Sequence, residues 1–236
     1  MSVSVIIPAG GVGKRFGANI PKQFIELAGA PLLVHTANIF NKVEEVDSIV
    51  ISVHSEWYTF TKEMFEKYGK GKVKEIVVGG LERQDSVSNA IHTKTVSESD
   101  VVLVHDAVRP FCSAQLIKKI LEVVEDVGAA IPAVKPSETI KEVSHKGEVI
   151  RTLDRTKLSL AQTPQGFWYD IIATAYEKAT KAGFYGPDSA SLVEFIGYKV
   201  TVIDGEDSNV KITTPFDFRI AEVIFDELSK DKKNKL

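Results

Sequence analysis

The chain has 236 residues, of which 44% are hydrophobic and 26% charged, so it is an ordinary globular protein able to bury roughly 70% of its unfolded surface. A formal net charge of −3 gives no field that would attract nucleic acid or an anionic membrane, so neither is expected as a partner. The single cysteine, Cys112, excludes an internal disulfide and a multi-cysteine metal site and fits a reducing cytoplasm.

Short β-branched runs alternate along the chain with segments of helical spacing. Continuous apolar strands that alternate with helices predict a Rossmann-like α/β fold, with a mostly parallel sheet covered by helices on both faces. The N-terminus lacks a basic region and is expected to be a buried strand rather than a signal peptide. No apolar run is long enough to span a membrane. The expected strands are 3–7, 48–53, 73–78, 101–104, 129–134 and 199–203, and the expected helices include 31–40, 57–68, 85–93 and 113–124.

The domain organisation follows from what the sequence lacks. No Pro/Gly/Ser-rich linker, repeat or low-complexity run divides the chain, so residues 1–228 are expected to form a single domain. Residues 229–236 hold four lysines and one aspartate and are expected to be a disordered basic tail. Because ligands of such sheets bind at the carboxyl ends of the strands, chemistry is expected just after each strand.

A glycine-rich loop, Pro-Ala-Gly-Gly-Val-Gly-Lys-Arg-Phe-Gly at residues 8–17, follows the first strand. Its glycines let the backbone approach a ligand, and successive N–H groups can form an anion-binding concavity. It is not a Walker A loop, because Arg15 follows Lys14, and it is not a dinucleotide fingerprint, because Phe16 stands where glycine or alanine is needed. Arg15 and Lys22 add two cations beside the glycines. The alternative interpretation is a tight turn with solvated charges.

Residues 79–87, Gly-Gly-Leu-Glu-Arg-Gln-Asp-Ser-Val, follow the third strand. The segment is typical of a helix N-terminus, with Asp85 and Ser86 as capping residues. A helix N-terminus also favours an anionic ligand, so capping and binding are compatible here.

A carboxylate follows the strand 101–104. Asp106 can hold Mg²⁺, which takes one or two protein carboxylates beside phosphate oxygens, or it can be a cap or turn residue. Arg109 brings a cation to the same pocket or forms an ion pair with a neighbouring carboxylate. His105 has no partner at metal-ligand spacing and is expected to be packed or hydrogen-bonded.

A β-hairpin is predicted at residues 139–143 and 148–152, because both runs alternate around a turn near Lys146-Gly147. A hairpin that leaves a doubly wound sheet has two unpaired edges, which a partner subunit would cover. The sequence therefore predicts a protruding β-hairpin arm at about 135–160, whose edges a partner subunit would cover.

The glycine loop with its following Pro-Lys resembles nucleotidyltransferases that activate sugar or polyol phosphates. Five further motifs narrow the match, and in this order they resemble the 2-C-methyl-D-erythritol 4-phosphate cytidylyltransferase family over about residues 3–227. These motifs are the segment 79–87, Val-His-Asp-Ala-Val-Arg-Pro at 104–110, Thr-Leu-Asp-Arg at 152–155, Gln-Thr-Pro-Gln at 162–165 and Asn-Val-Lys-Ile-Thr-Thr-Pro at 209–215.

The resemblance implies cytidylyl transfer from CTP to 2-C-methyl-D-erythritol 4-phosphate, giving 4-diphosphocytidyl-2-C-methyl-D-erythritol and pyrophosphate, with Mg²⁺ or another divalent cation. It also implies a homodimer in which the arm reaches the partner's active site. The attacking phosphate is already ionised, so catalysis should be positioning and charge neutralisation. The implied catalytic residues are Arg15, Lys22, Arg155 and Lys211; the implied nucleotide-binding residues are Pro8, Ala9, Gly10, Gly11, Gly13, Lys14, Gly80, Arg83 and Ser86; and the implied substrate-binding residues are Asp106, which is also the metal ligand, Arg109, Thr139, Arg155, Thr163 and Lys211.

Three positions, Val108, Ser159 and Pro187, depart from the family's pattern. Pro187 removes a hydroxyl that could contact the polyol. The form His-Asp-Ala-Val-Arg-Pro-Phe also resembles ribitol-5-phosphate cytidylyltransferases of teichoic-acid synthesis, which share the fold, CTP and the chemistry. The motifs at 152–155 and 190–194 and the Asn-Val-Lys-Ile-Thr run favour methylerythritol phosphate. A non-catalytic nucleotide-binding module is a second alternative, and the residue at position 16 disfavours a dinucleotide-dependent oxidoreductase.

Overall fold

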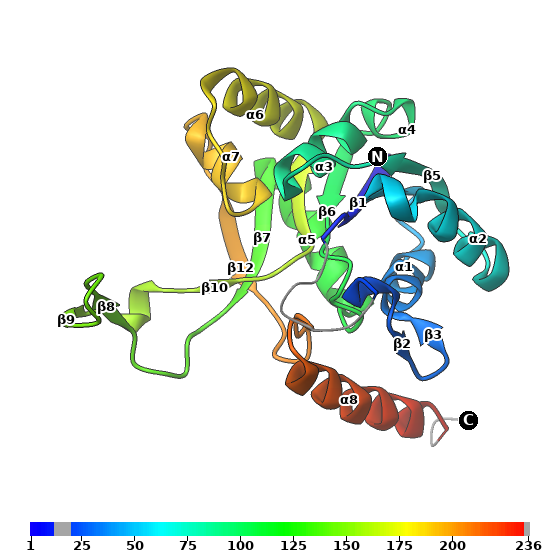
Figure 1. Cartoon of the computed structure of the whole chain (residues 1–236). Helices are drawn as coiled ribbons and strands as arrows, with labels where there is room; N and C mark the ends of the chain where they lie inside the picture. Colours follow the sequence, from blue (N-terminus) through cyan, green and yellow to red (C-terminus); the bar gives the residue numbers. More distant parts are fainter. Residues whose placement is uncertain (12–19, 234–236) are drawn as a thin grey trace.

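In the computed structural model, which describes residues 1–11 and 20–233, eight strands form one central sheet (Figure 1). Strand β7 pairs with β12 on one edge and with β10 and β11 on the other, and the order continues as β11-β6-β1-β4-β5. All six predicted strands are confirmed in this sheet. The strands are β1 (Val3–Ala9), β4 (Ser48–Val53), β5 (Val73–Val78), β6 (Val101–Val104), β7 (Ala129–Val134), β10 (Leu160–Ala161), β11 (Gln165–Trp168) and β12 (Thr201–Asp204).

The sheet is mostly parallel, as predicted, but two of its strands, β10 and β11, run antiparallel to their neighbours. β11 lies between β6 and β7 and runs antiparallel to both. β10 pairs antiparallel with β7. The remaining neighbours, β12 and β7, β6 and β1, β1 and β4, and β4 and β5, pair in parallel. β11 was not among the strands expected from the sequence, because its four residues Gln-Gly-Phe-Trp lack a β-branched run.

Helices cover both faces of the sheet, which explains the continuous apolar strands. On one face, Val5 and Ile7 of β1 pack with helices α1, α2 and α5, and on the other Ile6 packs with α3, α6 and α7. The helices of the first face are α1 (Leu32–Asn41), α2 (Tyr58–Tyr68) and α5 (Ala114–Val127), and those of the second are α3 (Arg83–Ile91), α6 (Tyr169–Ala182) and α7 (Ser189–Phe195). Shorter elements are η1 (Lys22–Phe24), β2 (Glu26–Leu27), β3 (Ala30–Pro31), η2 (Ser55–Trp57), α4 (Lys94–Ser97) and η3 (Arg155–Lys157).

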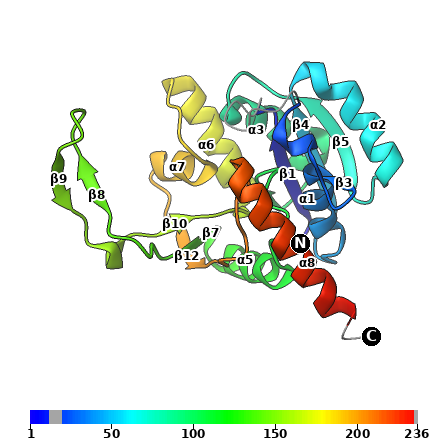
Figure 2. The ribbon, with the colours of Figure 1, turned by 60° about the horizontal axis from the view of Figure 1, so that its bottom comes forward.

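The predicted hairpin is confirmed. Strands β8 (Lys141–Val143) and β9 (Val149–Thr152) pair antiparallel and project away from the body of the molecule, as Figures 1 and 2 show. Gly147 has φ 80° at the turn, a conformation that glycine adopts without strain. Val149 and Ile150 are each 60% exposed, so the hairpin carries apolar side chains that its own chain leaves in solvent.

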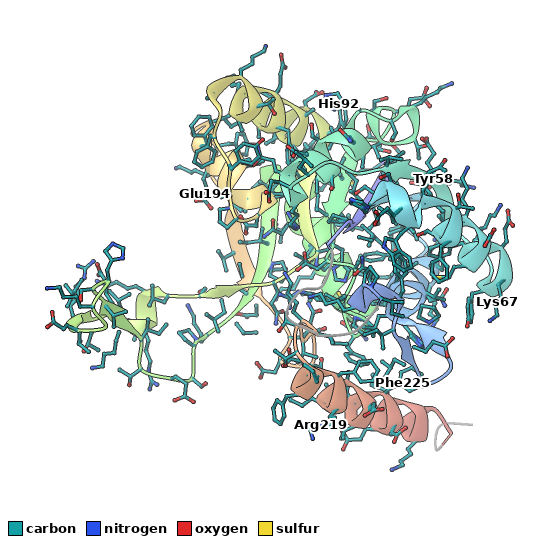
Figure 3. All side chains as sticks on the ribbon, in the orientation of Figure 1. Tyr58, Lys67, His92, Glu194, Arg219 and Phe225 are labelled. Atoms are coloured by element: carbon teal, nitrogen blue, oxygen red, sulfur yellow. The ribbon has the colours of Figure 1, made fainter. Side chains whose placement is uncertain are left out.

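Helix α8 (Pro215–Lys233) packs along one side of the molecule through a separate apolar cluster that includes Ile212 and Ala221. The Phe225 ring lies 5.1 Å from that of His35, and Figure 3 shows Phe225 on the side of α8 turned toward the body, with Arg219 opposite. The expectation of a disordered tail from residue 229 is wrong as far as Lys233, because these residues continue α8; residues 234–236 lie outside the described residues. Among the described helices, none has the length and apolarity that crossing a membrane requires.

Candidate functional site

A pocket of about 400 Å³ lies at the carboxyl edge of the sheet, beyond the ends of β1, β4, β5 and β6. This is the edge at which doubly wound sheets bind ligands, and the volume suits a small molecule. Its lining mixes glycines with charged side chains. The lining residues are Pro8, Ala9, Gly10, Gly11, Lys22, Gln23, His54, Gly80, Leu81, Glu82, Arg83, Ser86, Asp106, Ala107, Val108 and Lys211.

The glycine segments after β1 and β5 meet at Ser86. A Cβ atom at Gly79 would lie 2.6 Å from Ser86 Oγ, so no residue other than glycine fits at position 79 unless Ser86 moves. A Cβ atom at Gly10 would lie 3.3 Å from the same oxygen, which is a tight contact. Ser86 Oγ accepts a hydrogen bond from the N–H of Gly80 and donates one to the carbonyl of Glu82, both at 3.1 Å. Ser86 therefore holds the double glycine in place from within α3.

The N-terminus of α3 is capped differently from the sequence prediction. Glu82 is the N-cap residue and forms a capping box with Asp85, whose carboxylate accepts from the Glu82 N–H at 3.0 Å. Asp85 thus contributes to the cap as expected, whereas Ser86 lies inside the helix. The pocket consequently faces the start of a helix, where backbone N–H groups and the helix dipole favour an anion.

Three cations surround Asp106 at the end of β6. Lys211 Nζ lies 2.9 Å from Oδ2, Arg109 Nε lies 3.4 Å from Oδ2, and Arg83 Nη2 lies 3.4 Å from Oδ1. Burial raises the pKa of Asp106, but the charges of Arg83, Lys211 and Arg109 outweigh it and hold the pKa below its usual range. The carboxylate is therefore ionised at neutral pH and places two of these cations, Arg83 and Lys211, on the pocket wall.

The Lys211 segment is tied to the Asp106 loop by backbone groups. The Ile212 N–H donates to the Val108 carbonyl at 3.0 Å, and Arg109 Nη1 donates to the Asn209 carbonyl at 2.7 Å. These bonds join residues about a hundred positions apart in the sequence. They fix Lys211 opposite Asp106.

A buried polar network supports Asp106 from behind. Thr163 Oγ1 accepts from the Asp106 N–H at 3.0 Å and lies 3.1 Å from His105 Nδ1, while His105 Nε2 lies 3.0 Å from the Arg109 carbonyl. Burial lowers the pKa of His105 to about 4, so the ring is neutral at physiological pH. The prediction of a packed, hydrogen-bonded His105 is confirmed.

Two residues predicted to bind substrate lie in this network instead of on the pocket wall. Arg109 is 8% exposed and pairs with Asp106, which is the ion-pair alternative that the sequence left open, and Thr163 is 5% exposed. Neither lines the pocket of its own chain. In this conformation both residues orient Asp106.

The arm residues also lie away from their own chain's pocket. Thr139 precedes β8 and is exposed, and Arg155 starts η3 and donates from Nη1 to the Ser137 carbonyl at 2.5 Å. Neither lines the pocket. Gly13, Lys14 and Arg15 lie outside the described residues.

Several lining residues were missed by sequence reasoning. Gln23, His54, Leu81, Glu82 and Ala107 all face the pocket. His54 directly follows β4 and Ala107 comes soon after β6, so the rule that sites follow strands could have found both. Gln23 and Leu81 carry no signal beyond their neighbours in the glycine motifs.

Asp106 is the candidate metal ligand of this site. The described residues contain no group of three or more His, Cys, Asp or Glu side chains placed to hold a metal. Asp106 fits a cation that arrives with nucleotide phosphates, because Mg²⁺ needs only one or two protein carboxylates in that case. Its Oδ1 lies 3.4 Å from Arg83 Nη2, which leaves carboxylate lone pairs available.

Fold and pocket together are typical of an α/β protein that binds a nucleotide-type phosphate ligand at the carboxyl edge of its sheet. A profile of the family described as 2-C-methyl-D-erythritol 4-phosphate cytidylyltransferase matches residues 3–227. The enzyme of that name from Syntrophus aciditrophicus is 42% identical over 221 residues, covering 93% of this chain and 94% of that protein. The enzyme of that name from Geotalea uraniireducens is 43% identical over 234 residues, covering 98% of this chain and 100% of that protein.

Solved structures agree. The structure of 4-diphosphocytidyl-2C-methyl-D-erythritol synthase from Anaerococcus prevotii has a TM-score of 0.82 and 32% identity, covering 95% of this chain and 96% of that one. The 2-C-methyl-D-erythritol 4-phosphate cytidylyltransferase from Thermus thermophilus has a TM-score of 0.79 and 31% identity, covering 95% of this chain and 98% of that one. The chain belongs to the 2-C-methyl-D-erythritol 4-phosphate cytidylyltransferase family.

Proposed function

We propose that this chain transfers a cytidylyl group from CTP to 2-C-methyl-D-erythritol 4-phosphate, releasing pyrophosphate, in the non-mevalonate route to isoprenoids. The observation that carries the proposal is the pocket itself, in which glycine segments from two strand ends face Lys22, Arg83 and Lys211. Backbone N–H groups and cations are the groups that bind a triphosphate. Membership of the family supports the identity of both substrates.

The chemistry needs no general base, because the attacking oxygen belongs to a phosphate that is ionised at neutral pH. An oxygen of the polyol phosphate attacks the α-phosphorus of CTP, and the bond to the pyrophosphate oxygen breaks. Lys22 neutralises charge that grows on the triphosphate, and Lys211 holds the attacking phosphate. Arg15 is proposed to act with Lys22, and Arg155 with Lys211.

A divalent cation, Mg²⁺ or another, is proposed to accompany CTP, with Asp106 as its protein ligand. When bound, the ion would neutralise phosphate charge beside the same carboxylate that the three cations contact. Asp106 stays ionised across neutral pH and so remains able to bind it.

We also propose that the chain works as a homodimer joined through the arm. The hairpin leaves Val149 and Ile150 exposed, and two strands alone are marginally stable without a covered face. Thr139 and Arg155 lie on the arm, away from their own pocket, which supports a site completed by the partner's arm. The proposed binding of the substrate phosphate by these two residues then occurs across the dimer.

The test is pyrophosphate release with CTP and Mg²⁺, comparing methylerythritol phosphate with ribitol 5-phosphate. We expect the first acceptor to be preferred by at least about tenfold in kcat/KM. A preference for ribitol 5-phosphate would support the acceptor of the alternative family, which the names of the compared relatives do not favour. Binding of CTP without pyrophosphate release for any acceptor would support a non-catalytic module.

A further inference from the structure

Gln23 has a role at the pocket that neither its motif nor the mechanism above assigns. Its side chain is buried, at 3% exposure, on the short helix η1 between Lys22 and Phe24. Gln23 Nε2 donates one hydrogen bond to the carbonyl of Ala9 at 2.5 Å and another to the carbonyl of Gly11 at 3.0 Å. An amide nitrogen carries two hydrogens, so both donors of Gln23 are used on the glycine segment.

The two carbonyls that Gln23 binds, of Ala9 at the end of β1 and of Gly11 two residues beyond it, lie past the part of β1 that pairs with β6. β1 pairs with β4 as far as Ala9 but with β6 only as far as Ile6. The end of the strand therefore has backbone groups that no β6 residue pairs, and the Gln23 amide supplies donors to them. A carbonyl oxygen is repelled by a phosphate, so a triphosphate site requires these oxygens to be held elsewhere.

Gln23 also links the glycine segment to Lys22. η1 begins after Pro21 and is closed by the Phe24 N–H donating to the Pro21 carbonyl at 2.9 Å. On the far side of η1, the Phe24 ring packs against Trp57, with ring centroids 5.0 Å apart. Lys22 is thus carried on a turn held by aromatic packing on one side and by the Gln23 amide on the other.

From these contacts we infer that Gln23 is a positioning residue, whose two donated hydrogen bonds turn the Ala9 and Gly11 carbonyls away from the nucleotide phosphates and hold Lys22 against the glycine segment. The inference rests on the proposed function in so far as the ligand is CTP. It concerns nucleotide binding alone and does not depend on which polyol phosphate accepts the cytidylyl group.

The sharpest test replaces Gln23 by glutamate, which has nearly the same shape but sets carboxylate oxygens against the two carbonyls. CTP affinity of Gln23→Glu, measured by equilibrium titration without acceptor, should fall by about 10- to 100-fold. Lowering the pH from about 8 to about 6 should restore part of this loss relative to wild type, because a buried carboxyl beside carbonyls has a raised pKa and donates once protonated. An unchanged affinity, or a loss that does not recover at low pH, overturns the inference.

Two further variants control the experiment. Gln23→Met keeps the volume and removes both donors, so its CTP affinity should fall by about 5- to 30-fold at every pH; an unchanged affinity would overturn the inference even if the glutamate variant failed to fold. Gln115→Glu makes the same chemical change on the exposed surface of α5 and should bind CTP like wild type. Wild-type CTP binding and pyrophosphate release test the proposed function separately.

Discussion

Asp106 shows how single residues organise this pocket. A carboxylate that is 7% exposed would normally be neutralised by a shift in its pKa, yet here three cations keep it charged. The same contacts hold Arg83 and Lys211 in place, so the positive wall of the pocket is set before any nucleotide binds. Such preorganisation is the main source of electrostatic catalysis in phosphate transfer.

Replacing Lys22 tests whether this side chain neutralises the charge that grows on the triphosphate. Lys22→Ala should lower kcat by about 10²-fold or more, because an electrostatic stabiliser of the transition state is lost, and Arg15→Ala should do the same. The measurement is steady-state pyrophosphate release. Lys70→Ala, which removes only an exposed partner of Glu66, is the matched control. Near-normal turnover in Lys22→Ala would rule out the role.

Replacing Arg155 tests whether the arm binds the phosphate of the acceptor substrate. Arg155→Ala should raise the KM for the polyol phosphate by about tenfold or more and leave CTP binding unchanged, because a charge-assisted contact to one substrate is removed. Arg151→Ala on the same arm breaks only an ion pair with Glu142 and serves as control. Equal losses for both substrates would argue against the assignment.

Residue types alone could identify most of the candidate pocket but not the partners of each residue. Gly10, Gly80 and Lys22, which the glycine and lysine motifs single out, all line the pocket. Arg109 and Thr163 belong to equally good motifs, yet they lie behind the pocket. Their position depends on hydrogen bonds to Asp106 and Asn209 that no local pattern reports.

At the scale of elements, helix α8 determines where Lys211 lies. Asp217 Oδ2 accepts hydrogen bonds from the N–H and hydroxyl of Thr213 at 2.8 and 2.6 Å and from the Thr214 N–H at 2.8 Å. Asp217 in turn donates its own N–H to Thr214 Oγ1 at 3.2 Å. This reciprocal cap begins at Thr213, two residues after Lys211, and fixes the start of α8 at Pro215.

The cap predicts a pH-dependent contribution to stability. Partial burial raises the pKa of Asp217, but the hydrogen bonds from Thr213 and Thr214 outweigh it, so the pKa is lowered on folding. The stabilisation is therefore present above the unfolded pKa and is lost as the pH falls through the folded pKa. Asp217→Asn should lower the free energy of unfolding by about 1–2 kcal/mol at pH 7, with the difference from wild type shrinking below about pH 4.

Urea denaturation at several pH values measures this effect. Asp226→Asn on the exposed surface of the same helix is the control and should change stability by less than about 0.5 kcal/mol. If the free energies of unfolding of Asp217→Asn and wild type differed by the same amount from pH 7 to pH 3, protonation of Asp217 would not weaken the cap, which contradicts the prediction.

At the scale of the whole molecule, the arm separates two groups of proposed site residues. Figure 2 shows the arm, with β8 and β9 at its end, projecting from the body of the molecule. Lys211 lies on the pocket wall, whereas Arg155 lies in η3 on the arm, outside its own chain's pocket. A dimer that completes each pocket with the partner's arm would bring the two together. Exchange of identical elements between the two protomers is a known route to homodimers.

Mixed dimers test this arrangement directly. Assayed with the polyol phosphate below its wild-type KM, the Lys211→Ala and Arg155→Ala proteins should each be poorly active. After the two are unfolded and refolded together, half of the dimers would carry one intact site. The mixture should then recover about a quarter of wild-type activity. Refolding each variant alone is the control. No recovery in a mixture shown by mass to contain heterodimers would place both residues in one chain's site.

The sequence by itself determined the alternation of apolar strands and helices, the hairpin and the glycine segments, because these depend on local periodicity and backbone freedom. Only the tertiary structure decided that β11 runs antiparallel between β6 and β7, that Arg109 and Thr163 support Asp106 from behind, and that Gln23 holds the end of β1. Each of these depends on hydrogen bonds or packing between segments distant in the sequence, such as Asp106 with Thr163. Residue type limits which bonds can form, but the fold decides which partner is within reach.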